Sequence, residues 1–340
     1  MKIDCYAAFG PKQQLKKHSY TQEELGLHDV LIAITHCGIC HSDIHLIDDD
    51  WGMSVYPLVP GHEIVGTVIE RGEKVQSLKK GERVGVGWQA GACFECEWCM
   101  KGDENLCDKD QPTCVRRPGG YATAIAIDSR FAFSIPPELS SENAAPLLCG
   151  GITVYSPLRQ YDIKAPMKVG VVGIGGLGHL ALQFAKGFGC EVTAFSHTPS
   201  KEKEAKELGA QHFVNISDSA ELKKASRSMD TVISAVSSDL DWKAFMGVLR
   251  PKGKLIVVGA SPNPINVTAG VLIGDQKMIA GSVIGNRWLI KEMLEFSARH
   301  NIQAKTEVMP MSDANTAIKK VRENKARYRI VLTNISQKGK

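Results

Sequence analysis

Two patterns of apolar and polar positions divide this chain. Over residues 1–152 the apolar runs are short, as in DVLIAI (29–34), EIVGTVIE (63–70) and ERVGVGW (82–88), and glycine, proline or charged residues separate them. Such spacing is typical of a β-rich domain. Over residues 153–286, apolar runs of strand length alternate with longer segments of helical composition. This alternation predicts an α/β fold with a doubly wound parallel sheet.

The elements of the second pattern can be placed individually. Strands are predicted over residues 167–173, 190–196, 230–236, 254–260 and 277–285, and helices over 175–189 and 200–209. The C-terminal part adds two helical patterns, 289–301 and 312–324, and a strand-like segment, 327–333. Ser312 is a candidate cap for the second of these helices, because a serine hydroxyl accepts backbone hydrogen bonds at helix starts.

Size and composition are those of an ordinary globular protein. A length of 340 residues favours roughly two domains. The net charge of +4 is small and no dense basic run occurs, so we expect no nucleic-acid partner. The longest apolar stretch, 169–185, contains five glycines, so we expect no membrane span. Residues 1–10 lack the apolar core of a secretion signal, which favours a cytoplasmic location.

Four of the ten cysteines follow the spacing C-x2-C-x2-C-x7-C, namely Cys93, Cys96, Cys99 and Cys107. In a reducing cytoplasm, cysteines this close together are more often metal ligands than disulfide partners. The spacing differs from the ferredoxin run, which argues against an iron–sulfur cluster. Four thiolates leave no open position for a substrate, so we expect a structural zinc. The alternatives are a zinc module for nucleic acid, which the weak charge disfavours, and four unrelated buried cysteines.

A glycine-rich turn follows the strand predicted over 167–173. Gly173, Gly175 and Gly178 form G-x-G-x-x-G between a strand and a helix, with Gly176 and Leu177 completing the turn. The first glycine permits the tight turn, the second lets a pyrophosphate approach the backbone, and the third lets helix and strand pack closely. We therefore predict a dinucleotide site with the phosphates at the helix N-terminus. A buried glycine turn of another α/β fold is the alternative.

The end of the next predicted strand indicates which nicotinamide cofactor is preferred. Enzymes that use NAD usually carry an acidic residue there, which binds the ribose 2′-hydroxyl. Here Ser196 takes that position, followed by His197 and, four residues later, Lys201. A hydroxyl, an imidazole and an ammonium group accept a 2′-phosphate, which a carboxylate would repel. This predicts NADP(H), unless Lys201 merely belongs to an exposed helix start.

A second metal site is indicated by the segments CGICHSDIH (37–45) and GHE (61–63). A catalytic zinc takes about three protein ligands and keeps one position open. Cys40 and His62 are candidate ligands, and Cys149 in PLLCGGITVY is a candidate third. For Cys149 alone a buried core position would be the ordinary interpretation, because free cysteine is commonly buried.

Taken together, GHEIVGTV, CGICHSD, the four-cysteine segment, LLCGGITVY and GIGGLGHLALQFAK resemble the zinc-dependent medium-chain alcohol dehydrogenases. Within that family the chain resembles the cinnamyl alcohol dehydrogenase branch, and most closely the bacterial NADPH-dependent broad-range aldehyde reductases. The resemblance covers nearly the whole chain and keeps the order of the motifs. It implies a GroES-like catalytic domain formed by residues 1–152 and 287–340, and a Rossmann NADP-binding domain over 153–286.

The resemblance also implies roles for single residues. Cys40, His62 and Cys149 would bind the catalytic zinc, and the four-cysteine segment a structural zinc. Glu63 would be a carboxylate near the metal that can enter its ligand shell transiently. Asp43 would orient the ligand histidine and raise its basicity, which is a common function of a carboxylate behind a metal ligand. An ordinary turn-capping role is the alternative for Asp43.

Further residues match the proton relay and the cofactor site of the family. Ser42 would contact the substrate oxygen, and His45 would exchange protons with solvent at the outer end of the relay. His41 and Arg329 match positions near the cofactor pyrophosphate, and Thr153 matches a position near the nicotinamide. The implied reaction is reversible hydride transfer between NADPH and an aldehyde.

The predicted substrate region agrees with the resembled family in its aromatic residues but differs from it in the length of one loop. Trp51 and Trp88 match the substrate cleft and would give a flat apolar slot for aliphatic or aromatic aldehydes. The segment 108–120 is shorter than its counterpart in the plant cinnamyl enzymes, which argues against a strict phenylpropenyl preference; Arg116 and Arg117 within it are candidates for the pocket rim.

Relatives pair through the edge strand near 277–285, so we expect a homodimer. A polyol dehydrogenase of the same family, a zinc-free reductase and a non-enzymatic binding protein are the alternatives.

Overall fold

The computed structural model describes residues 1–261 and 263–334. The chain forms two compact units: Met1–Cys149 with Gly285–Lys340, and Gly150–Ile284. These units are called the first and the second unit below. The domain boundaries predicted from sequence, after residues 152 and 286, remain a proposal for how the folded chain divides. Among the described residues, every helix is too short or too polar to span a lipid bilayer.

The first unit is built on one large sheet. Its strands run in the order β16-β17-β3-β4-β5-β9, and β8 pairs with β3. The longest strand, β3 (Asp29–Ile39), pairs antiparallel with β4 (Glu63–Arg71), and Gly38 lies opposite Glu63 in that register. Most residues of β3 and the first half of β4 are buried, among them Ile32 and Ile64 in the core of this unit.

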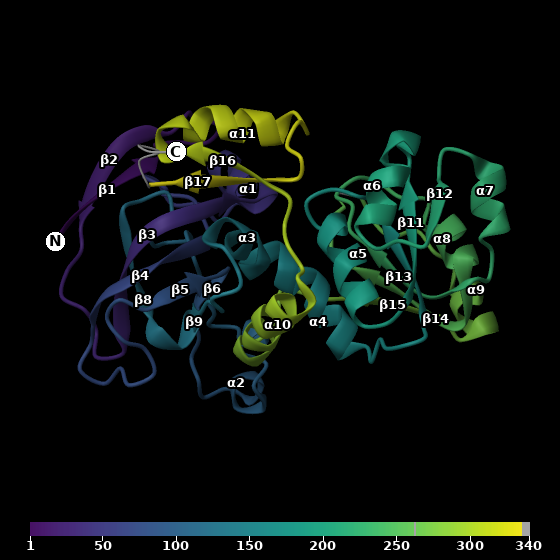
Figure 1. The fold of residues 1–340 in the computed structure, drawn as a ribbon, viewed down its shortest axis with the longest axis horizontal. Coiled ribbons are helices and arrows are strands. Elements are labelled where there is room, and N and C mark those ends of the chain that lie inside the picture. The colour runs from purple at the N-terminus through teal and green to yellow at the C-terminus, as the bar shows by residue number, and fades with distance from the viewer. Residues whose placement is uncertain (262, 335–340) are drawn as a thin grey trace. The chain divides into compact units, whose positions relative to one another are not determined.

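The remaining elements of the first unit are short. Its other strands are β1 (Lys2–Ala7), β2 (Lys16–Thr21), β5 (Arg83–Val86), β6 (Gln89–Gly91), β7 (Gln111–Pro112), β8 (Ala124–Asp128), β9 (Ala132–Ser134), β16 (Thr306–Pro310) and β17 (Arg329–Thr333). The helices are α1 (His41–Asp48), α2 (Glu97–Lys101), η1 (Glu104–Leu106), η2 (Ser129–Phe131), α3 (Ser141–Pro146), η3 (Leu147–Gly151), α10 (Arg287–His300), η5 (Met311–Asp313) and α11 (Ala314–Arg322). Helix α11 lies across β16 and β17 (Figure 1).

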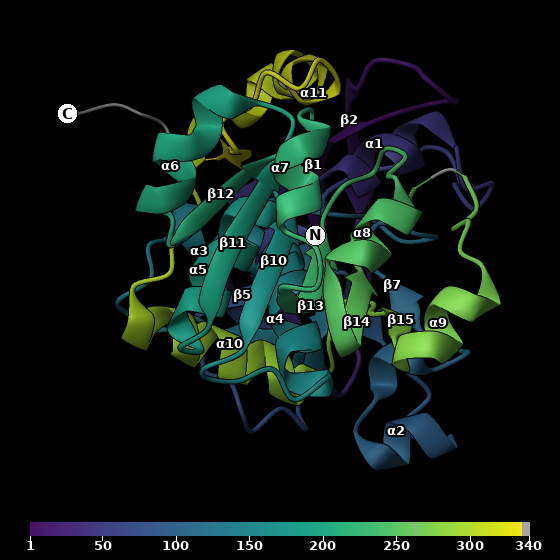
Figure 2. The same ribbon diagram turned by 90° about the vertical axis from the view of Figure 1, so that its right-hand side faces the viewer.

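The second unit contains a six-stranded parallel sheet in the order β12-β11-β10-β13-β14-β15, and Figure 2 looks onto these strands. They are β10 (Lys168–Val172), β11 (Glu191–Ser196), β12 (His212–Asn215), β13 (Met229–Ser234), β14 (Leu249–Val257) and β15 (Met278–Gly281). The helices are α4 (Ile152–Gln160), α5 (Gly178–Gly187), η4 (Pro199–Lys201), α6 (Glu202–Glu207), α7 (Ser219–Lys224), α8 (Trp242–Val248) and α9 (Ala269–Asp275). The sheet buries apolar strand residues such as Val172 and Val232 against Phe245 of α8.

The predicted fold class is confirmed, with differences of detail. Helix α5 begins at Gly178 rather than at 175, because the preceding residues form the glycine turn. Strand β12 was not predicted; it is short and its side chains are exposed or half-buried, so it carries little apolar signal. The predicted Ser312 cap is wrong: Ser312 lies inside the 3-10 turn η5, and its hydroxyl donates to the Asp313 carboxylate instead.

Candidate active site

Cys40, His62 and Cys149 meet in the first unit, although they come from three distant segments. Cys40 follows β3, His62 precedes β4, and Cys149 lies in the π-helical turn η3. The sulfurs of Cys40 and Cys149 are 3.9 Å apart, and His62 Nε2 lies 3.3 Å from the Cys149 sulfur. Ligand atoms around a tetrahedral zinc lie roughly 3.3–3.8 Å apart, given bonds of about 2.0–2.3 Å. This cysteine–histidine cluster, which also includes Glu63, therefore fits a zinc ion.

The pKa shifts of the two thiols in this cluster favour the binding of a cation. The hydrogen bond from Cys149 is the largest cause that lowers the pKa of Cys40 well below its ordinary value. The same shared bond, together with burial, raises the pKa of Cys149. Both shifts arise from this shared contact and favour Cys40, rather than Cys149, as the ionised sulfur. A thiolate, not a thiol, is the metal-binding form of cysteine.

Asp43 holds the two ligand-bearing segments together. Its carboxylate is fully buried; one oxygen lies 2.8 Å from His62 Nδ1 and accepts from the Gly61 amide at 3.0 Å, and the other accepts from the Cys40 amide at 2.9 Å. A buried carboxylate at Nδ1 keeps the proton on that nitrogen, so the Nε2 lone pair faces Cys149. This geometry is the one a carboxylate needs to orient a histidine ligand.

Glu63 and Arg329 form a buried ion pair beside the cluster. Glu63 begins β4 and Arg329 begins β17, so strands far apart in sequence bring the charges together. A Cβ atom at Gly38 would lie 2.0 Å from Glu63 Oε2, so only glycine leaves room for this carboxylate. Glu63 Oε2 and Arg329 Nε have no hydrogen-bond partner among the described residues. The predicted contact of Arg329 with a pyrophosphate remains a prediction.

Helix α1 carries the predicted relay residues. The Ser42 hydroxyl lies 3.7 Å from the Cys40 sulfur, and His45 is partly exposed one turn further on. His45 Nδ1 lies 2.7 Å from Asp50 Oδ2, a contact that we did not predict. Asp49 adopts a left-handed conformation (φ 58°) that ends the helix and turns Asp50 back toward His45. The run of three aspartates at the end of the helix, residues 48–50, was the available sequence signal. His41 is the first residue of α1, and burial lowers its pKa.

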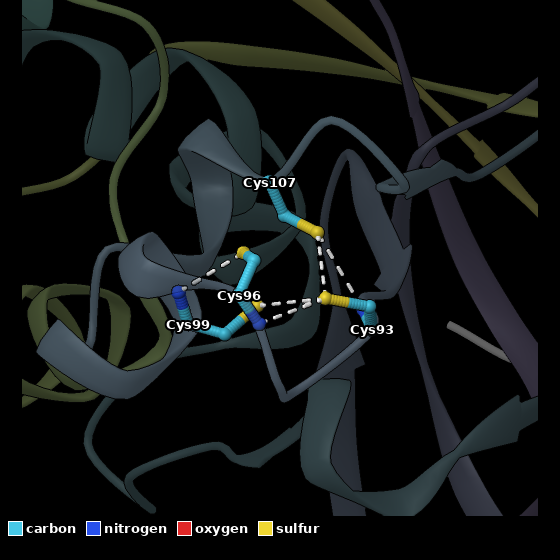
Figure 3. A group of neighbouring side chains, drawn as sticks. All are labelled: Cys93, Cys96, Cys99 and Cys107. Carbon is cyan, nitrogen blue, oxygen red and sulfur yellow. Dashed lines mark hydrogen bonds between the residues drawn. The ribbon is translucent and has the colours of Figure 1, made fainter.

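The four-cysteine segment folds into a compact sulfur cluster, shown in Figure 3. The Cys93 sulfur lies 3.9 Å from that of Cys99 and 3.5 Å from that of Cys107, and Cys96 caps α2. Backbone N–H groups point at these sulfurs, which stabilises their ionised form. Hydrogen bonds from the backbone of Glu95 are the largest cause that lowers the pKa of Cys93 to about 6. The predicted ligand set is brought together.

In the second unit, the three glycines of the predicted turn have different surroundings. Gly173 has φ 85°, a conformation that favours glycine. A Cβ atom at Gly178 would lie 1.8 Å from the Gly173 carbonyl oxygen, whereas one at Gly175 would meet nothing within 4 Å. Gly178 therefore serves the packing of helix on strand, and Gly175 leaves open space. Gly176 and Leu177 complete the turn into α5.

The end of β11 carries no carboxylate. Ser196 is buried and its hydroxyl accepts from the Thr198 amide at 3.1 Å, and His197 is exposed. The Lys201 ammonium group donates to the Ile174 carbonyl at 2.6 Å, so it lies beside the glycine turn. Thr153 is half-buried on α4 of the same unit.

Two tryptophans lie beside the cysteine–histidine cluster. The ring of Trp88 is 4.9 Å from that of His62 and 6.2 Å from that of Trp51, with both pairs near perpendicular. Trp51 is 43% exposed and also contacts the ring of His45 at 5.1 Å. The structure thus packs Trp88 against His62 of the cluster and places Trp51 against Trp88.

The chain matches two family models: the alcohol dehydrogenase GroES-like domain over residues 26–137, and the zinc-binding dehydrogenase model over 176–299. A probable mannitol dehydrogenase of Fragaria ananassa is 44% identical, covering 97% of this chain and 95% of the relative. The aldehyde reductase AdhA of a Synechocystis strain is 39% identical, covering 98% and 99%.

Solved structures agree with these matches. A cinnamyl alcohol dehydrogenase of Sorghum bicolor superposes with a TM-score of 0.94 at 37% identity over 100% of both chains. The Helicobacter pylori enzyme described as CAD, complexed with NADP(H), gives 0.90 at 32% identity over 98% of both. The predicted family is confirmed: this chain belongs to the zinc-binding alcohol dehydrogenases, in the cinnamyl alcohol dehydrogenase-like branch.

Proposed function

We propose that this oxidoreductase is a zinc- and NADPH-dependent aldehyde reductase. It transfers hydride reversibly between NADP(H) and a broad range of aliphatic or aromatic aldehydes and primary alcohols. The observation that carries the proposal is the cysteine–histidine cluster with Asp43 behind His62, because it offers two sulfurs and one correctly oriented nitrogen at zinc-binding distances. The four-cysteine cluster is proposed to hold a second, structural zinc.

Several residues of the chain have distinct roles in the proposed reaction. When bound, the catalytic zinc supplies Lewis-acid polarisation of a carbonyl oxygen. The Ser42 hydroxyl, close to the Cys40 sulfur, is positioned to give a proton to the oxygen of the reduced substrate. Asp50 accepts from His45 Nδ1, which fixes the ring and leaves Nε2 free to exchange protons with solvent.

The aromatic residues set the kind of substrate. Trp51 and Trp88 provide flat apolar surface next to His62, which suits an aldehyde with an apolar body. The Fragaria relative named as a probable mannitol dehydrogenase favours a second candidate function, oxidation of a polyol. We further propose that the enzyme works in the cytoplasm, because all ten of its cysteines are free and six of them form the two clusters.

The cofactor preference is proposed from the end of β11. Ser196, His197 and the Lys201 ammonium group offer donors for a 2′-phosphate, and no carboxylate stands in that position to repel it. The Helicobacter pylori relative was solved with NADP(H), which supports the same choice.

A spectrophotometric panel tests the function directly. Purified enzyme is assayed with aliphatic and aromatic aldehydes and with mannitol, using NADPH or NADH, before and after metal removal by a chelator. We expect reduction of several aldehydes with NADPH, loss of activity on chelation and recovery on adding zinc. Preferred oxidation of mannitol would select the second function, and full activity without metal would refute the proposed chemistry.

Ser196→Asp tests the cofactor assignment. The added charge repels a 2′-phosphate, so the ratio of kcat/KM for NADPH to that for NADH should fall at least about tenfold. Ser226→Asp, an exposed position in the same unit, adds the same charge as a control and should leave the ratio unchanged. A variant at 196 that still strongly prefers NADPH would show that the phosphate site lies elsewhere.

A further inference from the structure

Trp88 lies just beyond the end of a strand ladder in the first unit. Strands β4 and β5 pair antiparallel, and the last pair of their register is Ile64 with Val86. His62 and Trp88 lie two residues beyond that pair, one on the side of each strand, so the ladder brings them together past its end. The backbone at Trp88 therefore needs hydrogen-bond partners from another segment to keep its place.

Thr113 supplies those partners. It directly follows β7, which pairs with β6, and it is fully buried. Its hydroxyl donates to the Gly87 carbonyl at 2.8 Å, and its backbone amide donates to the Trp88 carbonyl at 2.6 Å. A Cβ atom at Gly87 would lie 2.6 Å from the Leu148 carbonyl oxygen, so this segment is also packed closely against the turn η3. One threonine thus binds two consecutive carbonyl groups of the segment that carries the indole.

The loop 113–121 also binds the segment before His62. The Gly120 amide donates to the Gly61 carbonyl at 2.7 Å. The second residue of the loop, Cys114, has φ 64°, a conformation that favours glycine and costs energy in other residues, so it persists only where the surroundings fix the backbone. One loop therefore holds both the segment of the indole and the segment of the imidazole.

These contacts place the two rings against each other. The indole of Trp88 meets the imidazole of His62 at a centroid distance of 4.9 Å and an interplanar angle of 85°. Edge-to-face contact of this kind is a preferred arrangement of aromatic rings. Trp51, in contrast, is 43% exposed and reaches His62 only through Trp88. Trp88 therefore provides the apolar surface that lies directly beside a proposed zinc ligand.

We propose that Thr113 is a positioning residue that holds Trp88 against His62, and that the indole surface fixed in this way selects aldehydes whose carbonyl carbon carries a flat apolar group, such as an aromatic ring. This inference rests on the proposed function and narrows its substrate class. A flat group gains contact with a fixed indole, whereas acetaldehyde is too small to gain much from it. Contact made equally in the bound substrate and in the transition state changes KM rather than kcat.

Thr113→Val tests the role, because it keeps the size of the side chain and removes the hydroxyl that binds the Gly87 carbonyl. Initial rates with NADPH give kcat and KM for benzaldehyde and for acetaldehyde. We expect the KM for benzaldehyde to rise at least about fivefold, while kcat and the KM for acetaldehyde stay within about twofold of the wild type. Thr113→Ser keeps the hydroxyl and should restore the wild-type KM.

Further variants separate positioning from a general loss of structure. Thr35→Val removes a hydroxyl that donates to the Val65 carbonyl at 3.1 Å in the same unit, and as the matched control it should leave both KM values unchanged. In a Trp88→Ala background, Thr113→Val should have no additional effect on the KM for benzaldehyde, because the indole surface is already absent. Thr113→Ala replaces Thr113→Val throughout if circular dichroism shows that the valine variant is not folded.

The outcomes distinguish this inference from the proposed function. If the wild type reduces both aldehydes but Thr113→Val keeps the wild-type KM for benzaldehyde, with or without a change in kcat, the inference alone is overturned. It is also overturned if Thr113→Val raises that KM as much in the Trp88→Ala background as in the wild type, since Thr113 would then not act through Trp88. A wild type that reduces neither aldehyde would refute the proposed function, and the inference with it.

Discussion

At the scale of single residues, Asp43 is the most important group of the candidate site that is not itself a proposed metal ligand. One buried carboxylate binds the Cys40 amide, the Gly61 amide and His62 Nδ1. It therefore fixes two ligand-bearing segments in one geometry and selects the histidine tautomer. Removing it should disturb metal binding without removing any metal ligand.

Asp43→Asn tests this role. The amide cannot carry the negative charge that stabilises the His62 Nδ1–H group, so the affinity of the catalytic site for zinc should fall about 10- to 100-fold. Competition with a chromophoric chelator measures that affinity. Asp48→Asn is the control on the same helix, because Asp48 instead pairs with Arg322. Unchanged zinc affinity in Asp43→Asn would refute the orienting role.

The thiols of the four-cysteine cluster should differ in reactivity once the metal is removed. The pKa of Cys93 is lowered to about 6, chiefly by backbone N–H groups, whereas burial raises that of Cys99 to about 12. The thiolate is the reactive form. Iodoacetamide should therefore label Cys93 faster than Cys99 at pH 7, and labelling of Cys93 should slow as the pH falls through about 6.

Mass spectrometry of the digested, alkylated protein measures this order. Zinc-loaded protein is the control, in which both cysteines should be protected. Equal labelling of the two cysteines in the metal-depleted protein would contradict the assigned difference.

The residue types of the metal site could be predicted from sequence, but their neighbours could not. Cys40, His62 and Cys149 carry a strong signal because cysteine and histidine are rare and their chemistry is specific. Asp50 was missed because an acidic residue after a helix has many ordinary roles, and only the left-handed turn at Asp49 brings it to His45. The pairing of Glu63 with Arg329 depends on strands 266 residues apart, a relation that local pattern does not contain.

At the scale of elements, one glycine of the turn lets helix and strand pack closely, and another leaves open space beside the turn. Gly178 touches the Gly173 carbonyl, whereas Gly175 faces open space. Sequence predicted from one motif that Gly178 serves packing and Gly175 the approach of a pyrophosphate, and the structure adds that, of these two, a Cβ atom would clash only at Gly178. The boundaries of α5 were also misplaced, because helical periodicity continues into a turn that the glycines interrupt. In the same way, the polarity of Ser312 fits a cap, but a 3-10 turn takes that position.

Two alanine substitutions distinguish these roles. Gly178→Ala places a methyl group against a backbone oxygen and should lower the Tm by roughly 5 °C or more. Gly175→Ala should keep the wild-type Tm but weaken NADPH binding at least about tenfold, because the methyl group fills the space for the pyrophosphate. Differential scanning fluorimetry and fluorescence titration measure the two effects.

Gly247→Ala, on α8 of the same unit, has open space around the new methyl group and is the control for both measurements. It should retain wild-type NADPH affinity and an equal or higher Tm, since alanine favours a helix over glycine. Wild-type NADPH affinity in Gly175→Ala would contradict the proposed place of the pyrophosphate.

At the scale of the whole molecule, the sheet of the second unit ends at β15, with no further strand beyond it among the described residues. Strand β15 ends the six-stranded sheet, and Ile273, Met278 and Val283, on or near it, are 75%, 46% and 53% exposed. An unpaired edge with apolar side chains favours pairing with another chain. We propose that two copies pair through β15, as the family resemblance implies.

Light scattering coupled to size-exclusion chromatography tests this assembly. Wild type should elute with about twice the 37.0 kDa mass of the chain, and the double variant Met278→Glu, Val283→Glu should elute as a monomer, because charges at the edge oppose pairing. Val55→Glu, at an exposed apolar position of the first unit, should leave the mass of the wild type unchanged. A double variant that keeps the wild-type mass would show that β15 is not the interface.

We propose that Cys40, His62 and Cys149 hold one metal ion and that the four-cysteine cluster holds another. The zinc content per chain of wild type and of Cys149→Ala, measured by inductively coupled plasma mass spectrometry, tests it most directly. We expect two zinc ions per chain in the wild type and one in the variant, whose four-cysteine cluster is intact. Equal zinc content in the two proteins would contradict it.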